Sequence, residues 1–275
     1  MNYDPQYISQ YYDAYGEREW TRLEASPSAK VNFYIHRYYL ERYIKPGVHV
    51  LEAGAGPGRF TIELAKLGAK ITVGDISPGQ LELNRQKVKE AGCEASVVRR
   101  EILDITNLSR FADKSFDAVV CYGGPLSYVM ERADDAVGEL LRVTQPSGYL
   151  LLSVMSLLGT TQRYLPSVWE LADQFGLSSV QKVINTGDLS GEINKGHICR
   201  MYRWAQLQAL LERHPCKIRA ASAANFLSLH HEEILKHIES DSTKWETFLQ
   251  WELDFCKESG ALDGGTHIIA VVRRD

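Results

Sequence analysis

The stretch "VLEAGAGPGRF", residues 50–60, decides the fold, because an apolar run ends there in glycines at every second position. Glycine loses more backbone freedom on folding than any other residue, so it is kept where the chain must turn or come close to another group. The apolar run predicts a short strand, and "GRFTIELAKLG" (58–68) predicts a helix that a glycine ends. A strand, a glycine loop and a helix in this order present backbone N–H groups to a ligand.

Strands and helices continue to alternate up to residue 156. Further strands are predicted at 69–77, 94–103, 116–124 and 149–156, with helices at 78–92 and 131–148. Strands separated by helices of about 10 to 15 residues are typical of an α/β fold, in which helices cover both faces of a parallel sheet. The carboxyl ends of such strands share one edge, where ligands bind.

Composition narrows the classes of function. The net charge of −4 argues against a nucleic-acid partner, which would need a basic face. The 5 cysteines are odd in number and lack metal-ligand spacing, so we expect reduced thiols, no metal and a cytoplasmic protein. Since no apolar run approaches the roughly 18 to 20 residues of a membrane helix, we expect no membrane partner.

The glycine spacing disfavours two nucleotide-binding motifs. A dinucleotide fingerprint starting at Gly54 would need glycine or alanine at position 59, which is Arg59. A phosphate-binding P-loop would need a Lys-Ser or Lys-Thr pair after the glycines, and none follows. A nicotinamide-dependent dehydrogenase is therefore a weak alternative.

Two aspartates follow predicted strands and fit a nucleoside. Asp75 ends the second strand about 20 residues after the glycine loop, where a carboxylate can accept both hydroxyls of a ribose. The alternative is that Asp75 caps the next helix. Asp104, with the backbone of Ile105, could bind the edge of an adenine ring, or Asp104 could be a loop residue that bonds its own backbone.

These motifs together resemble those of the class I S-adenosylmethionine-dependent methyltransferases, in particular the small-molecule type. The resemblance rests on "VLEAGAGPGRFTIELAKLGAKITVGDIS", "LDI" and "FDAVVCYGGPLSYV", within residues 48–156, and on the closing pair of strands. It implies a Rossmann-like seven-stranded, mostly parallel sheet whose last strand is antiparallel, with a helical cap. It also implies S-adenosylmethionine as the cofactor.

The resemblance carries over to individual residues. Positions that match cofactor contacts of the family are Glu52, Gly54, Gly56, Gly58, Asp75, Ile76, Asp104, Ile105 and the strand-end Cys121. We add Gln80, Tyr15 and Arg22, the last as a donor to the cofactor carboxylate. Tyr7, Tyr11 and Tyr15 recur every four residues and predict a helix that either packs on the domain surface or covers a ligand.

The domain organisation expected from this family has four parts. They are an N-terminal helical lid at 1–45, the cofactor-binding core at 46–156, a substrate cap at 157–200, and a segment at 201–275 that completes the sheet and carries a helical insertion at 230–258. The insertion packs on the sheet, with a dimer contact and a wall of the substrate pocket as alternatives.

Substrate contacts are expected from the loop after the fourth strand and from the cap. The candidates are Tyr122, Gly124, Ser127, Tyr128, Arg163, Tyr164, Trp169, Arg200 and Tyr202. His197 is the first choice for a general base, since the ordinary pKa of histidine suits proton removal near neutral pH, and a structural histidine is the alternative.

The sequence therefore predicts methyl transfer to an oxygen or nitrogen of a small organic metabolite or natural product, by alignment of the reactants more than by a dedicated base. The tetrapeptide Asn/Asp-Pro-Pro-Tyr/Phe, typical of DNA-base and glutamine methyltransferases, is replaced here by "CYGGPLSY" (121–128). The alternatives are a peptide or protein carboxylate or amine as the acceptor, and a non-catalytic S-adenosylmethionine-binding protein.

Overall fold

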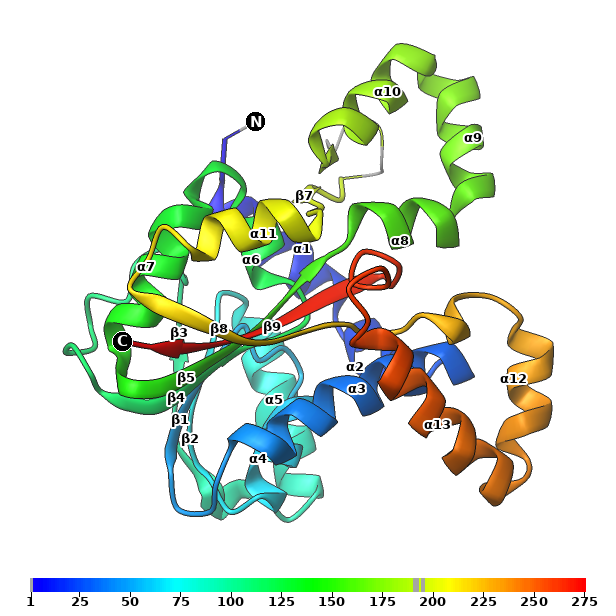
Figure 1. Ribbon diagram of the computed structural model, residues 1–275. Helices are drawn as coiled ribbons and strands as arrows, with labels where there is room; N and C mark the ends of the chain where they lie inside the picture. Colours follow the sequence, from blue (N-terminus) through cyan, green and yellow to red (C-terminus); the bar gives the residue numbers. More distant parts are fainter. Residues whose placement is uncertain (1, 190–192, 194–195) are drawn as a thin grey trace.

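The computed structural model describes residues 2–189, 193 and 196–275. A seven-stranded sheet runs through this part of the chain in the order β3-β2-β1-β4-β5-β9-β8 (Figure 1). Its strands are β1 (His49–Ala53), β2 (Lys70–Asp75), β3 (Val97–Ile102), β4 (Phe116–Cys121), β5 (Thr144–Met155), β8 (Cys216–Ala223) and β9 (His267–Arg274). Strand β9 is antiparallel to both β5 and β8, and the pairs from β3 to β5 are parallel. The predicted seven-stranded, mostly parallel sheet is confirmed.

The strand order places the candidate site. The chain winds from β1 outward to β2 and β3, and then returns past β1 to β4 and β5. The order therefore reverses between β1 and β4, and in open α/β sheets ligands bind beyond the carboxyl ends of the strands at such a point. The glycine loop leaves β1 at this position.

Helices cover both faces of the sheet, and each face has its own apolar core (Figure 1). One face is covered by α3 (Pro27–Tyr43), α4 (Arg59–Lys66), α5 (Pro78–Glu90) and α13 (Ser242–Cys256). The other is covered by α6 (Pro125–Tyr128), α7 (Ala133–Val143) and α11 (Trp204–Leu211). The central strands are mostly apolar because both faces are buried, as in other parallel sheets.

The N-terminal segment divides into two parts. Helix α1 (Pro5–Tyr15) begins at Asp4, whose side chain accepts hydrogen bonds from the N–H groups of Gln6 and Tyr7. It is followed by the short α2 (Arg18–Arg22). Helix α3, by contrast, buries Val31, Ile35 and Leu40 completely against the sheet. The part of 1–45 that can serve as a lid is therefore α1 with α2, and α3 belongs to the core.

The segment expected as a substrate cap projects from the sheet edge (Figure 1). It contains α8 (Leu157–Arg163), α9 (Leu165–Phe175), α10 (Leu177–Thr186) and the two-stranded pair β6 (Asp188–Leu189) and β7 (Cys199–Arg200). Residues 190–192 and 194–195 of this range lie outside the described residues. The insertion at 230–258 contains α12 (Glu232–Glu239) and α13. In the described part of the chain, no helix is both long and apolar enough to cross a membrane.

Candidate active site

The glycine loop after β1 is shaped by contacts inside the protein. The N–H groups of Gly54 and Ala55 donate to the carbonyl of Gly74 at 2.8 and 3.0 Å, which ties the loop to β2. Gly54 has a φ of +81°, and a Cβ there would lie 2.2 Å from Cγ of Pro125. A Cβ on Gly58 would lie only 3.0 Å from Nδ2 of Asn84. Gly56 differs, since its nearest neighbour would be Cγ of Glu19 at 3.8 Å, across the cavity described next.

Asp75 holds the glycine loop and faces the same cavity. Its Oδ2 accepts the N–H of Gly56 at 2.7 Å, and its Oδ1 accepts the N–H of Ser77 at 2.9 Å. Burial raises the pKa of Asp75 to about 6, although these two hydrogen bonds act in the opposite direction. A buried carboxylate that lines a cavity beside a glycine loop can accept further hydrogen bonds from ligand hydroxyls.

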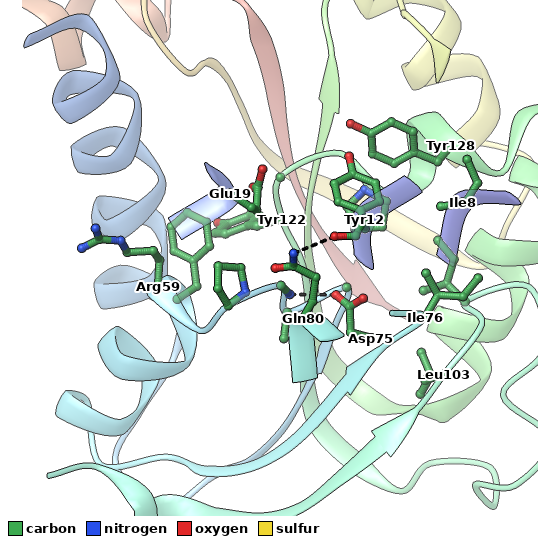
Figure 2. Close-up of a pocket in the computed structure, with 18 of the residues that line it drawn as sticks. Ile8, Tyr12, Glu19, Arg59, Asp75, Ile76, Gln80, Leu103, Tyr122 and Tyr128 are labelled. Carbon is green, nitrogen blue, oxygen red and sulfur yellow. Dashed lines mark hydrogen bonds between the residues drawn. The ribbon is translucent and has the colours of Figure 1, made fainter. Parts of the chain in front are cut away.

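The first cavity lies over the ends of β1, β2 and β4 and has a volume of about 100 Å³ (Figure 2). At one end, beyond Asp75, its walls are apolar and come from Ile76, Leu103 and Ile105. The lid covers it with Ile8 and Tyr12 from α1 and with Glu19 and Arg22 from α2. Small-molecule sites usually have about 300 to 1,000 Å³, so this cavity is smaller than a typical small-molecule site.

Hydrogen bonds join α1 to the residues that follow Asp75. Nε2 of Gln80 donates to the carbonyls of Tyr12 at 2.9 Å and Gly16 at 3.1 Å (Figure 2 shows the first of these bonds). Oδ1 of Asp13 accepts the N–H of Gly79 at 2.8 Å. Hydrogen bonds from α5 thus hold α1 over the cavity. Because α5 begins just after β2, they also join α1 to the end of β2.

A second cavity of about 610 Å³ adjoins the first. Its walls include five tyrosines, three arginines and two histidines, namely Tyr11, Tyr12, Tyr15, Tyr128, Tyr164, Arg18, Arg22, Arg163, His197 and His267. The two cavities share six residues, which are Tyr12, Glu19, Leu23, Arg22, Gly123 and Tyr128. A ligand in one cavity is therefore separated from a ligand in the other by a single layer of side chains.

Both histidines of the second cavity have lowered pKa values, which favours their uncharged forms. Burial lowers the pKa of His197, whose Nδ1 lies 3.2 Å from the hydroxyl of Tyr11. Burial, and then the charges of Arg22 and His36, lower the pKa of His267 well below its ordinary value. Neutral imidazoles can accept a hydrogen bond or a proton from a ligand at neutral pH.

The predicted cofactor residues do not all reach the first cavity. Those that line it are Arg22, Gly54, Gly56, Asp75, Ile76, Gln80 and Ile105, whereas Tyr15 lines the second cavity. Glu52 is buried and accepts the hydroxyl of Thr61 at 2.6 Å. Asp104 accepts the N–H and the hydroxyl of Thr106, each at 2.8 Å, which is the local alternative considered for it. Gly58 packs against α5, and the Cys121 side chain is fully buried.

Only some of the predicted substrate residues line one of the two cavities. Tyr122 lines the first cavity, Tyr128 lines both, and Arg163, Tyr164 and His197 line the second. Arg163 also forms an ion pair with Glu232 of α12 at 2.8 Å. Gly124, Ser127, Trp169, Arg200 and Tyr202 line neither cavity.

Three of the residues outside the cavities have contacts inside the protein that account for their positions. The hydroxyl of Ser127 accepts the N–H of Met155 at 3.0 Å. Arg200 pairs with Asp188 at 2.6 Å, and Tyr202 is buried in the core with α11. Trp169 is 58% exposed on α9. We therefore do not carry these residues forward as substrate contacts.

Several residues that line the cavities were not predicted from the sequence, among them Tyr12, Glu19, Gly123 and His267. Tyr12 and Glu19 lie on the lid, Gly123 follows β4, and His267 begins β9. The spacing of Glu19 and Arg22, three positions apart, is compatible with an ion pair on a helix and could have indicated Glu19. No sequence pattern distinguishes His267, because a single histidine before an apolar strand is common.

The sheet order and the glycine loop after β1 place this chain among the Rossmann-like α/β folds. Residues 50–148 match the family model described as the methyltransferase domain. This match shows that the segment is similar to methyltransferase domains.

Relatives with known names match part of the chain. A demethylmenaquinone methyltransferase of Mycobacterium sp. (strain KMS) is 37% identical over 118 residues, which are 41% of this chain and 44% of that protein. A malonyl-acyl-carrier-protein O-methyltransferase of Serratia marcescens is 29% identical over 131 residues, or 46% of each chain. The matched region thus spans less than half the length of these relatives.

Solved structures resemble the whole chain in fold. The [4+2]-cyclase SpnF has a TM-score of 0.63 at 17% identity, over 100% of this chain and 97% of its own. The 1,6-didemethyltoxoflavin-N1-methyltransferase of Burkholderia thailandensis, solved with its substrate and S-adenosylhomocysteine, has a TM-score of 0.58 at 13% identity, over 98% and 88%. Likeness at this level of identity shows the fold alone, and the cyclase indicates that this fold also serves other chemistry.

Proposed function

We propose that this protein is an S-adenosylmethionine-dependent methyltransferase that transfers the methyl group to an oxygen or nitrogen of a small organic molecule. The observation that carries the proposal is the pair of adjoining cavities that share six wall residues. The first cavity has the groups for a nucleoside cofactor, and the second has the size and the walls for an acceptor. When bound, the cofactor would supply a methyl group activated by a sulfonium.

The residues of the first cavity fit this cofactor. Asp75 offers a carboxylate to the ribose hydroxyls, and the glycine loop leaves room beside it. The apolar walls from Ile76, Leu103 and Ile105 suit a flat base. The segment that matches the methyltransferase domain model, residues 50–148, contains these residues, which supports the assignment.

The second cavity fits a small aromatic or otherwise planar acceptor. Its volume of about 610 Å³ lies within the usual range for small-molecule sites, and tyrosine rings form much of its wall. The protein's main task would be to exclude water and to align the acceptor with the first cavity across the shared residues. His197 or His267 would accept a proton where the acceptor arrives protonated.

Two measurements test this proposal. Calorimetry with S-adenosylmethionine and with NAD should show binding of the first and not of the second. Incubation with methyl-labelled S-adenosylmethionine and a metabolite extract of the source organism, followed by mass spectrometry, should then show a labelled small molecule. Label on protein would favour the peptide or protein acceptor. Binding without any transfer would favour a binding protein or another chemistry, as in the cyclase of the same fold.

A further inference from the structure

His267 is the first residue of β9, and its imidazole lines the second cavity. Strand β9 is antiparallel to β5, and His267 is paired with Met155 at the end of β5. The side chain therefore stands at the edge of the sheet where the parallel strands end. The same edge carries Gly123, which lines both cavities. His267 is thus placed to contact an acceptor that lies next to the first cavity.

One ring nitrogen of His267 is bound inside the protein. Its Nδ1 lies 3.2 Å from Oγ1 of Thr266. The same hydroxyl oxygen lies 3.3 Å from Oδ1 of Asn225 and accepts a hydrogen bond from Nδ2 of Asn32 at 3.3 Å. Two further bonds orient the Asn225 amide, because its Oδ1 accepts the N–H of Thr266 at 2.8 Å and its Nδ2 donates to the hydroxyl of Ser28 at 3.2 Å. The hydroxyl of Thr266 therefore has three polar neighbours.

The position of the hydroxyl proton decides the tautomer of His267. A threonine hydroxyl donates one hydrogen bond and can accept two. If Thr266 donates to Asn225, its oxygen accepts from Asn32 and from an Nδ1–H of His267, so all three contacts are hydrogen bonds. If it donates to Nδ1 instead, the oxygens of Thr266 and Asn225 face each other at 3.3 Å without a proton between them. The first arrangement makes one bond more, and it leaves the lone pair of a neutral His267 on Nε2.

The other ring nitrogen, Nε2, is open to the second cavity. It has no hydrogen-bond partner among the residues that the structure describes. Nε2 of the neighbouring His36 is enclosed without a partner, whereas Nε2 of His267 is not enclosed in this way. Burial, and then the charges of Arg22 and His36, lower the pKa of His267, so this nitrogen keeps its lone pair at neutral pH. A lone pair that faces a cavity is a site for a hydrogen-bond donor of the ligand.

We propose that His267 selects acceptors by their hydroxyl group, with Nε2 accepting a hydrogen bond from the oxygen that is to be methylated, and that Thr266 and Asn225 are positioning residues that hold the ring in this tautomer. The proposal rests on the proposed function, which places the acceptor in the second cavity. A hydroxyl benefits more than a neutral amine, because the amine already offers a lone pair while it keeps its protons. A methylated product has no hydrogen on this oxygen, so the site favours substrate over product.

The first test measures this selection with two probes, 2-naphthol and 2-methoxynaphthalene, which share their rings and differ in the hydrogen on oxygen. Calorimetry, with and without S-adenosylhomocysteine, should show that the wild type binds 2-naphthol about tenfold more tightly. His267→Phe should bring the two dissociation constants to within about twofold of each other. Equal affinities in the wild type, or an undiminished preference in His267→Phe, would overturn the inference.

The matched control for this test is His197→Phe. His197 lines the same cavity, but its Nδ1 lies 3.2 Å from the hydroxyl of Tyr11. The variant should keep the ratio of the two dissociation constants. Loss of the preference in this variant would overturn the inference, because the preference would then not belong to His267.

The second test reads the tautomer by NMR of nitrogen-labelled histidine side chains in the full chain. The resonances that are missing from His267→Phe identify His267, and the wild type should carry the proton on Nδ1. Thr266→Val should move the proton toward Nε2, and Thr266→Ser should restore the wild-type tautomer. Thr72→Val is the control, since Oγ1 of Thr72 lies 3.0 Å from Nε2 of His49, and it should leave His267 unchanged. A proton on Nε2 in the wild type would overturn the inference.

These measurements separate the inference from the proposed function. If S-adenosylhomocysteine failed to bind while both tests gave the expected results, the second cavity would still recognise a hydroxyl and the proposed methyl transfer would fail. If S-adenosylhomocysteine bound and the wild type bound neither naphthalene probe, the inference would fail and the cofactor assignment would stand.

Discussion

The carboxylate of Asp75 accepts the backbone N–H of Gly56 at 2.7 Å, which joins the end of β2 to the loop that follows β1. This side chain therefore adds to the backbone pairing that already joins the two strands. The same carboxylate lines the first cavity, so a single residue shapes the loop and offers acceptors to a ligand.

Replacement of Asp75 should weaken cofactor binding. In Asp75→Asn an amide NH2 group replaces one carboxylate oxygen, and this group donates hydrogen bonds but cannot accept them. The variant therefore loses the bond from the N–H of either Gly56 or Ser77, and it can accept fewer hydrogen bonds from the hydroxyls of a ribose. We expect the dissociation constant of S-adenosylhomocysteine to rise about tenfold or more in calorimetry. Asp117→Asn is the control, because Asp117 accepts the N–H of His49 at 2.8 Å at the start of β1 instead of its end. A similar affinity in the Asp75 variant and the wild type would remove Asp75 from the site.

Gly54 should be required for packing. Gly54→Ala places a methyl group 2.2 Å from Cγ of Pro125 in a backbone with φ of +81°. Gly47→Ala is a matched comparison, since Gly47 has φ of +84° and open space around its Cβ position. Backbone strain should cost each variant about 1 kcal/mol, and the clash should cost Gly54→Ala a further ~1 to 3 kcal/mol in urea unfolding. Equal losses would mean that Pro125 moves aside freely.

Much of the fold could be predicted because its signals are local. A strand that is apolar on both faces, a glycine turn and an amphipathic helix each leave a pattern within about 15 residues. Asp75 was found in the same way, since its distance from the glycine loop follows from one βαβ unit.

The walls of the second cavity depend on contacts between distant segments, which no local pattern contains. The tyrosine stripe at 7, 11 and 15 indicated a helix, and Tyr11 and Tyr15 line the second cavity. Tyr12, on another side of that helix, lines both cavities, and the stripe gave no sign of it. Trp169 attracted notice as a large aromatic residue of the cap and is 58% exposed. Which side of a helix meets the sheet is decided by the packing of the whole chain.

Glu52 should make stability fall as the pH rises. Burial raises its pKa to about 8 from an ordinary value near 4.5, although the hydroxyl of Thr61 acts in the opposite direction. Between these values the folded protein holds a proton that the unfolded chain has lost, so the stabilisation is complete below the unfolded pKa and is lost as the pH rises through about 8. The change should be on the order of a few kcal/mol.

Glu52→Gln should remove this part of the pH dependence, because the amide stays neutral. The difference in unfolding free energy between the variant and the wild type, measured in urea at pH 5 and pH 8, isolates the residue from other titrating groups. The variant should gain stability relative to the wild type at the higher pH. If the difference did not change with pH, Glu52 would have to be ionised in the folded protein throughout this range.

The hydrogen bonds from Gln80 should hold the lid closed. Gln80→Ala removes both bonds from Nε2 to the carbonyls of Tyr12 and Gly16, while α5 itself should keep its packing. We expect trypsin to cut after Arg18 or Arg22 several-fold faster than in the wild type, because α1 and α2 open more often. The dissociation constant of S-adenosylhomocysteine should rise about three- to tenfold.

Gln86→Ala is the matched control for this variant, because Gln86 lies on the same helix and its Nε2 bonds Glu82 at 3.4 Å on the exposed side. Its cleavage rate and ligand affinity should equal those of the wild type. Saturating S-adenosylhomocysteine should slow cleavage in all three proteins, since a ligand in the first cavity is covered by α1 and α2. Equal cleavage of the Gln80 and Gln86 variants would mean that Asp13 and the apolar contacts of α1 hold the lid without Gln80.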